Sequence, residues 1–315
     1  MTIPRLEALL DALADEAPQP VARGRLALGR ALGWTGHTTW PDAAWAFSGL
    51  AAGQPVELVW RPGRPGLFWT AEPAAPEMDR RRRFGRALAV LRANGAPLSA
   101  PDRALAASAF AAASVEWPVF VAGRHHCAGD AAKLYVHSRH VASGFDDLAA
   151  QMRPGDAAMM MGVGSDGLRE LYWDHPVRQV GDLWSWCRCP HLAPLAAGLD
   201  ARLRDWTGEG LDDAAGGRIG LSLCAAADGR PVAFAAFLPV RKAGGADRVR
   251  HRMLDEGGAA NPALATAWAA GDLHPMMLTL AVTVAGPATA IGLRLPGLRP
   301  GLRARLQAGQ QAGSA

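Results

Sequence analysis

Four polar or cationic side chains recur at every second position of one short stretch. Residues 131–140 are AAKLYVHSRH, and a β-strand there places Lys133, Tyr135, His137 and Arg139 on one face, with apolar residues on the other. The 315-residue chain has only two lysines and two tyrosines, and one of each lies in this stretch. An ammonium group and a phenol hydroxyl side by side can stabilise negative charge. We therefore expect a strand with apolar packing behind it and a polar site in front.

The same alternation recurs along the chain in pairs separated by turn residues. The expected strands form five hairpins, over 54–60 with 66–73, 117–121 with 133–139, 158–163 with 168–174, 218–225 with 232–241, and 277–284 with 289–295. Helical patterns separate them, over 4–15, 79–94, 101–114, 144–153, about 177–206 and about 246–270. Residues 20–53 fit neither period clearly.

Five antiparallel hairpins separated by helices predict an α+β fold. The hairpins argue against a Rossmann fold or a TIM barrel, because single strands alternate with helices there. In the fourth and fifth hairpins one strand face is bulky, and the other carries small residues such as Gly220, Ser222 and Ala235. Closing ten strands removes both sheet edges. We predict a closed ten-stranded antiparallel β-barrel inside a ring of α-helices, with an open lumen. The alternative is an α+β sandwich with a solvated sheet face.

Composition and charge narrow the class of protein. The net charge of +4 is modest, and the basic run over 79–83 opens a helical pattern without a second basic cluster or interleaved aromatics. We expect a solvated helix face there and no nucleic-acid partner. No apolar run reaches the roughly 18 residues that span a bilayer, and four cysteines provide no disulfide framework. We expect a cytoplasmic protein without a membrane partner, with one domain over 1–298 and a flexible tail over 299–315.

Two other patterns point weakly to metal or nucleotide sites. Cys187, Cys189 and His191 could bind zinc together with the His-His-Cys run 125–127, but the C-x-C spacing is shorter than the usual C-x₂-C. Residues 162–167 match G-x-G-x-x-G, but no helix follows, so we expect a hairpin turn. We predict no metal site.

The hairpins and five local motifs resemble the ABBA-type (PT-barrel) aromatic prenyltransferases, in particular the indole, dimethylallyl-tryptophan-synthase-like branch. The matched stretches are 54–60 for "tPxElSw", 68–73 for "RFtfEP", 133–135 for "KxY", 171–173 for a second tyrosine-bearing strand, and 237–241 with Asp247 for "YxPxR…D". They cover about residues 45–300 in order and spacing. The resemblance implies transfer of an allylic, dimethylallyl-like group from its diphosphate to an electron-rich aromatic acceptor.

The resemblance also implies roles for individual residues. Glu57 is the expected catalytic carboxylate, which contacts the acceptor N–H and accepts a proton late in the reaction. The residues expected to bind the diphosphate are Lys133, Tyr135 and Tyr172, with Arg61, Arg139 and Arg294 as additional candidates. The expected acceptor is indole- or tryptophan-type: free tryptophan, an indole product or a tryptophan in a peptide. No cofactor is required, and Mg²⁺ is an optional partner of the diphosphate.

Several positions depart from the family pattern. Phe68 stands where the family has arginine, Leu168 and Glu170 stand where it has cations, and Phe237 replaces a tyrosine. We expect Phe68, Glu170 and Phe237 to line the lumen near the acceptor. Glu170 has three alternative uses: a ligand for Mg²⁺, recognition of an amine on the acceptor, or a solvated position. Because the cation set is thinned, Lys133 is expected to bear much of the diphosphate's charge.

Alternatives from other functional classes stay open at this point. A PT-barrel protein without transfer activity would bind a hydrophobic or aromatic ligand, and an enzyme on the same barrel would use Glu170 and nearby histidines for metal-assisted chemistry. Without the family match, Glu57 is more simply a solvated edge residue, and Lys133 a surface residue. Diphosphate binding that depends on Lys133 would argue against the first alternative, and metal analysis of the purified protein tests the second.

Overall fold

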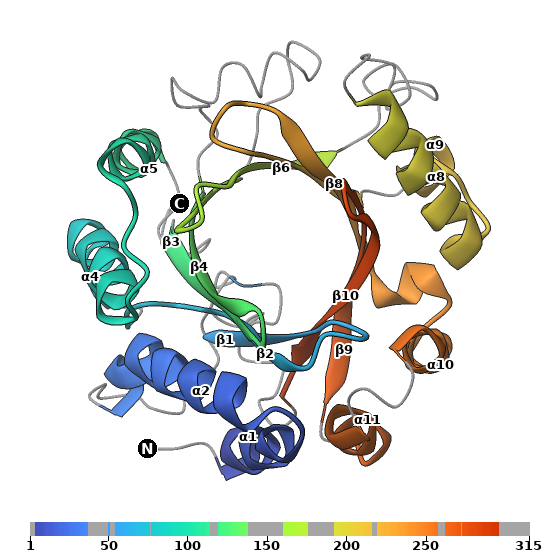
Figure 1. Cartoon of the computed structure of the whole chain (residues 1–315), viewed down its shortest axis with the longest axis horizontal. Helices are drawn as coiled ribbons and strands as arrows, with labels where there is room; N and C mark the ends of the chain where they lie inside the picture. Colours follow the sequence, from blue (N-terminus) through green and yellow to red (C-terminus); the bar gives the residue numbers. More distant parts are fainter. Residues whose placement is uncertain are drawn as a thin grey trace, which may run out of the picture.

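A closed β-barrel forms the centre of the molecule, and helices lie around it (Figure 1). The computed structural model describes residues 4–36, 50, 54–75, 77–113, 119–137, 160–175, 192–215, 219–257, 262–271 and 273–295. The ten strands follow one another around the barrel in sequence order, every neighbouring pair is antiparallel, and β1 closes on β10. The predicted ten-stranded barrel of five hairpins is confirmed, and the sandwich is excluded.

Strand boundaries agree with the expected ranges to within three residues in four of the hairpins. The strands are β1 (Val56–Trp60), β2 (Gly66–Ala71), β3 (Val119–His126), β4 (Gly129–His137), β5 (Met160–Gly164), β6 (Arg169–His175), β7 (Ile219–Ala225), β8 (Pro231–Pro239), β9 (His274–Thr283) and β10 (Gly286–Arg294). The second hairpin is longer than expected, because β3 and β4 continue to the turn at Cys127 and Ala128. Its Ala-, Gly- and His-rich ends have low strand propensity, and pairing within the barrel overrides that propensity.

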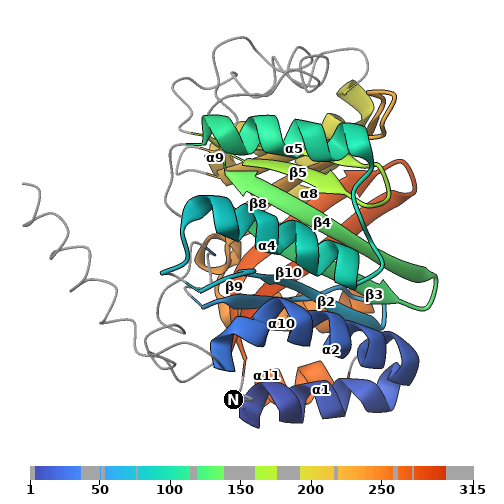
Figure 2. The same ribbon diagram turned by 90° about the vertical axis from the view of Figure 1, so that its left-hand side faces the viewer.

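The described helices lie outside the barrel, as Figures 1 and 2 show. They are α1 (Pro4–Glu16), α2 (Pro18–Leu32), α4 (Arg80–Ala93), α5 (Ala100–Ala112), α8 (Ala193–Thr207), α9 (Leu211–Ala215), α10 (Ala246–Gly257) and α11 (Pro262–Ala269), with 3₁₀ turns η1 (Gly33–Gly36) and η2 (Val240–Ala243). The helix expected over about 246–270 is in fact two helices. The helix expected over 144–153 and the first part of the one over about 177–206 lie outside the described residues. None of the described helices is long and apolar enough to cross a membrane.

Helix α2 was missed because its prolines and glycines lower helix propensity. Gly24 nevertheless has a packing role: a Cβ there would lie 2.9 Å from Leu67 Cβ on β2. Glycine therefore lets α2 approach the barrel closely, and α2 packs on β2 and β3. The sequence pattern alone does not show this contact, because it joins residues far apart in the chain.

The basic run at the start of α4 is only partly a solvated face. Asp79 caps the helix by accepting hydrogen bonds from the backbone N–H groups of Arg81 and Arg82, and both arginines are exposed. Arg83, however, is only 1% exposed and pairs with Glu72 at 3.0 Å. This buried pair joins α4 to the end of β2 and gives the glutamate of the matched "RFtfEP" motif a structural partner.

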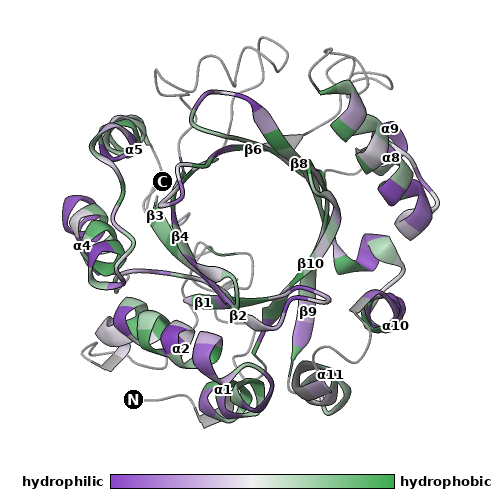
Figure 3. Cartoon of the chain, in the orientation of Figure 1, coloured by the Kyte–Doolittle hydropathy of each residue, from purple (hydrophilic) through white to green (hydrophobic). Residues whose placement is uncertain are grey.

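The core of the protein lies between the barrel and its helices. One face of each strand points outward into this layer, as shown by the buried side chains of Leu58, Leu134, Leu171, Leu221 and Leu280. The surrounding helices α2, α4 and α8 carry both hydrophobic and hydrophilic residues (Figure 3), as amphipathic helices with one buried face do. The opposite face of every strand therefore points into the lumen.

Candidate active site

Aromatic side chains from three strands meet inside the barrel. On β4, Leu134 and Val136 are fully buried against the helices, so Lys133 and Tyr135 have the inward parity that the sequence predicts. The ring centroids of Tyr135 and Tyr172 lie 5.7 Å apart in a T-shaped contact, and those of Tyr172 and Phe237 lie 5.6 Å apart. These three rings line one wall of the lumen. Arg139, which shares their expected face, lies outside the described residues.

The side chain of Lys133 extends along the inner face of the barrel, over β5, to Glu170. Its Nζ donates to Glu170 Oε2 in an ion pair whose residues are 3% and 8% exposed, while Ser222 Oγ donates to Glu170 Oε1 at 2.6 Å. The two charges are on β4 and β6, with Gly162 of β5 between them. A Cβ on Gly162 would lie 3.0 Å from Lys133 Cδ. The missing side chain therefore gives the lysine room to cross β5.

Protonation states follow from this pairing. Burial by itself raises the pKa of Glu170, but the charge of Lys133 and the hydrogen bonds of Lys133, Ser222 and Tyr172 outweigh it and lower the pKa to about 2. Burial opposes the charge of Lys133, and the Glu170 carboxylate raises its pKa above the ordinary value. Both groups are ionised at neutral pH. The carboxylate is thus the counterion of Lys133, a use not among the three expected for Glu170.

Glu57 lies on β1, beside β10, at a buried position. A Cβ on Gly292 would come within 2.2 Å of Glu57 Oε1, so the carboxyl group lies directly over this glycine. No hydrogen bond or ion pair to Glu57 is found in the described part of the chain, and burial raises its pKa to about 7. Near neutral pH the group therefore exists in both protonation states, the condition that suits a proton acceptor.

Two arginines occupy the lumen side of the barrel around Phe68. The guanidinium carbon of Arg61 lies 4.9 Å from the centre of the Phe68 ring, and Arg124 on β3 is the cross-strand partner of Phe68. His126 stacks on the same ring at a centroid distance of 6.1 Å. Sequence reasoning found Arg61 but missed Arg124, because 122–126 was expected in a loop. The period-2 spacing of Phe120, Arg124 and His126 was the available signal.

Arg294 is placed away from the other expected diphosphate ligands. It ends β10 opposite His274, and β1, β2 and β3 separate β10 from β4. It has the parity of Gly292 and lies toward the end of the barrel where β1 begins, whereas Arg61 follows the other end of β1. The structure therefore brings Arg294 toward Glu57 and not to Lys133 or the tyrosines.

The structure places part of the weak metal pattern and all of the weak nucleotide pattern. In the ranges that the structure describes, no three His, Cys, Asp or Glu residues are grouped as a metal site would need. His125 stacks on Trp69 at 6.3 Å, while Cys187, Cys189 and His191 fall outside those ranges. The glycine-rich run over 162–167 spans the end of β5 and the turn before β6, so the predicted hairpin turn is confirmed.

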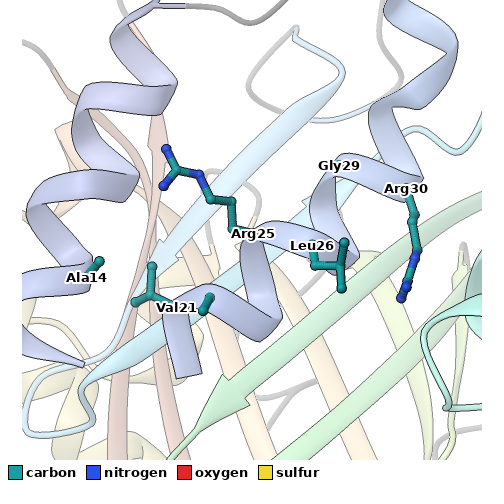
Figure 4. A pocket seen from close by; sticks show the side chains of 7 residues that line it. Ala14, Val21, Arg25, Leu26, Gly29 and Arg30 are labelled. Atoms are coloured by element: carbon teal, nitrogen blue, oxygen red, sulfur yellow. The ribbon is translucent and has the colours of Figure 1, made fainter. Parts of the chain in front are cut away.

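A hollow of about 530 Å³ lies on the outer surface between α1 and α2, with Ala14, Val21, Arg25, Leu26 and Arg30 among its lining residues (Figure 4). The Arg25 guanidinium is already paired with Glu7 and Asp11. The hollow thus offers apolar walls but no convergent set of free polar groups. The barrel interior, where carboxylate, cations and aromatic rings meet, is the candidate active site.

A closed barrel of consecutive antiparallel strands, built from five hairpins with helices outside, is the PT-barrel fold. No protein-family model and no curated protein matches the sequence. Among solved structures, 5-dimethylallyltryptophan synthase from Streptomyces coelicolor is similar, with a TM-score of 0.67 and 18% identity over 93% of this chain and 96% of that one.

Two further solved structures share the architecture. PriB, solved as a binary complex with product diphosphate, has a TM-score of 0.64 and 16% identity over 94% of this chain and 99% of its own. AnaPT from Neosartorya fischeri has a TM-score of 0.58 and 14% identity over 95% and 96% of the two chains. At these identities the comparisons establish a shared fold over nearly the whole length.

Proposed function

We propose that this protein is an aromatic prenyltransferase that uses an allylic diphosphate as donor and an indole- or tryptophan-type acceptor. The observation that carries the proposal is a carboxyl group without a charge partner, Glu57, in the same closed lumen as the cations Arg61, Arg124 and Lys133 and the aromatic wall. Solved barrels of this architecture include a dimethylallyltryptophan synthase and a complex with product diphosphate, which supports this choice of donor and acceptor.

The proposed reaction is an electrophilic substitution. Arginine guanidinium groups and tyrosine hydroxyls stabilise the negative charge that develops as the diphosphate leaves. The allylic cation is held against the faces of Tyr135, Tyr172 and Phe237, which attract positive charge and exclude water. The acceptor ring attacks the cation while Glu57 orients its N–H group. The ring then loses a proton, which Glu57 accepts.

The acceptor and the compartment are proposals of the same kind. NotF, another similar structure, was solved with brevianamide F and DMSPP, which favours an acceptor of the indole class. A tryptophan within a peptide is a further candidate acceptor. We also propose that the protein acts in the cytoplasm, where the thiols of Cys127 and Cys224, both free in the structure, stay reduced.

Coordination of Mg²⁺ by Glu170 does not fit the residues around this carboxylate. Oε2 of this carboxylate is engaged by Lys133 and Oε1 by Ser222, whereas Mg²⁺ binds free carboxylate oxygens and water. Turnover with and without EDTA measures whether the diphosphate needs Mg²⁺ in solution.

The proposal is tested with the purified full chain, dimethylallyl and geranyl diphosphate, and a panel of indole, tryptophan and tryptophan-containing peptides. We expect acceptor-dependent release of diphosphate and a product heavier by one prenyl group in mass spectrometry. No release with any pair would overturn transfer activity. Binding of a non-hydrolysable thiolodiphosphate without release would support the second candidate, a ligand-binding barrel, which the neutralised charge of Lys133 favours.

Gly292→Ala should lower the transfer rate by about ten- to a hundredfold, since a displacement of about 1 Å in a reacting group has effects of this size. The added Cβ would overlap Glu57 Oε1, so the carboxyl group must move. The rate is measured by diphosphate release at saturating donor. Gly85→Ala in α4, where nothing lies within 4 Å of the new Cβ, is the matched control and should turn over normally. An unchanged rate in Gly292→Ala would contradict the placement of Glu57.

A further inference from the structure

His125 is a buried imidazole outside the lumen that the proposed reaction does not use. It has the outward parity of Val121 on β3, is 5% exposed, and stacks on Trp69 of β2. Helix α2 covers the ring, since a Cβ on Gly24 would lie 3.0 Å from His125 Cδ2. Among the described residues, neither ring nitrogen of His125 has a hydrogen-bond partner, and Trp69 Nε1 has none either. Buried polar atoms are normally hydrogen-bonded, so this cluster requires an explanation.

The unpaired nitrogen atoms of the two rings lie beside the same small space. A Cβ on Gly123 would be 2.5 Å from Trp69 Cε2, which is bonded to Nε1, and 2.7 Å from His125 Nε2. A cavity of about 10 Å³ adjoins both rings, which is room for about one water molecule. A neutral imidazole can present a lone pair there, which is complementary to the indole N–H. An imidazolium would present a second N–H, so that two donors would meet in this space.

The charged and titratable groups around the ring come from α2, β3 and β4. Asp130 Oδ1 on β4 lies 3.4 Å from His125 Nδ1, but Arg23 of α2 already binds both oxygens of this carboxylate, at 2.8 and 3.0 Å. Burial lowers the pKa of His125 below its ordinary value of 6.5; Asp130 opposes this effect. Arg23 and the neighbouring His126 lower the pKa further. The residues of β2 and α4 that line the cavity are uncharged. The ring is therefore neutral at pH 7 in the folded protein.

We propose that His125 is a pH-sensitive latch that holds helix α2 on the barrel near neutral pH and releases it in mild acid. An imidazolium is fully solvated only when the ring reaches water, and α2 lies between the ring and water. A state with α2 moved away binds more protons below pH 6.5 than the closed state does. The free energy of opening therefore falls as pH falls. Because α2 packs on β2 and β3, which carry Phe68 and Arg124 on their inner faces, its release loosens the wall of the lumen.

The inference is tested by hydrogen–deuterium exchange of the full chain at pH 7.5 and pH 5.5, with rates corrected for intrinsic exchange. Exchange in α2 should rise by about three- to tenfold at pH 5.5. Helix α8, which packs on β8 and β9 across the barrel (Figure 1), is the internal reference and should not respond. His125→Gln should abolish the response of α2, because an amide does not titrate. His251→Gln, which removes an exposed imidazole from α10, is the matched control and should retain it.

The comparison of α2 with α8 in the wild-type chain decides the result without any variant. Equal responses of the two helices would overturn the inference, and so would a response of α2 that persists in His125→Gln. Asp130→Asn separates the imidazole from the ion pair. It should retain the response, because the carboxylate opposes the effect of burial on the imidazole; a response lost there and kept in His125→Gln would assign the switch to the Arg23–Asp130 pair instead. Circular dichroism at both pH values shows whether each variant is folded.

Discussion

Glu57→Gln should reduce the rate of prenyl transfer by about 10²–10⁴-fold, the usual contribution of a positioned proton acceptor. Glutamine keeps the volume and the hydrogen-bonding oxygen above Gly292 but cannot take up a proton. Affinity for the thiolodiphosphate probe should change little, because the diphosphate is held by cations elsewhere in the lumen. Single-turnover measurement of product, together with calorimetry, separates the two effects. A variant that transfers at the wild-type rate would exclude Glu57 as the proton acceptor.

The pH dependence of the transfer rate gives a second readout of the role of Glu57. Since burial raises the pKa of Glu57 to about 7, the carboxylate that accepts the proton is lost as pH falls below this value. The wild-type rate should therefore drop about tenfold per pH unit below the pKa, and Glu57→Gln should lack this limb. Arg294→Gln, which removes a nearby cation from the same end of the lumen, should keep the limb.

The raised pKa also predicts a change in stability. In the folded protein Glu57 holds a proton up to about pH 7, whereas in the unfolded chain it releases the proton near 4.5. Because the folded state binds the extra proton, the free energy of unfolding falls as pH rises through this window. Above pH 7 the cost reaches about 3 kcal/mol. Glu57→Gln should therefore be more stable than the wild type at pH 8, as measured by urea unfolding.

Lys133→Met should destabilise the protein by about 3–5 kcal/mol, the effect of leaving one charge of a buried pair without its partner. The Glu170 carboxylate would stay buried, without the ammonium group but still hydrogen-bonded by the hydroxyl groups of Ser222 and Tyr172. In the wild type the depressed pKa of Glu170 contributes stability that is present above about pH 4.5 and is lost as pH falls toward 2. In the variant this contribution is gone, so its deficit should be largest at neutral pH and smaller in acid.

The double variant Lys133→Met/Glu170→Gln distinguishes pairing from packing. It removes both charges and should recover most of the lost stability, because neutral residues of similar volume replace a buried pair at little cost. The exposed pair of Arg23 and Asp130, with side chains 43% and 36% exposed, is the matched control, and Arg23→Met should cost at most about 1 kcal/mol. A double variant as unstable as Lys133→Met would show that the packing of the lysine chain, rather than its charge, is what matters.

Much of the architecture follows from local patterns. Alternation with period 2 and turn residues such as the Gly-rich run before β6 define the hairpins, and the assignment of inner and outer faces in β7 to β10 agrees with the strand register. Helix α2 was missed because close packing on β2 requires Gly24, which weakens the helical pattern. The full length of β3 was missed for a related reason, since pairing on both sides compensates for weak strand propensity.

For the candidate site too, some features follow from the sequence and others only from the tertiary structure. The amino-acid sequence by itself determined the strand order and the inward parity of Glu57, Lys133 and Tyr135, because side-chain direction in a strand depends only on position along it. Tertiary structure alone decided which charges meet. Lys133 and Glu170 are 37 residues apart and are joined across Gly162, whereas Arg124 and Phe68 are joined by the register of two neighbouring strands. Electrostatic interactions depend on distance in space, and that distance is set by the register in which the strands pair.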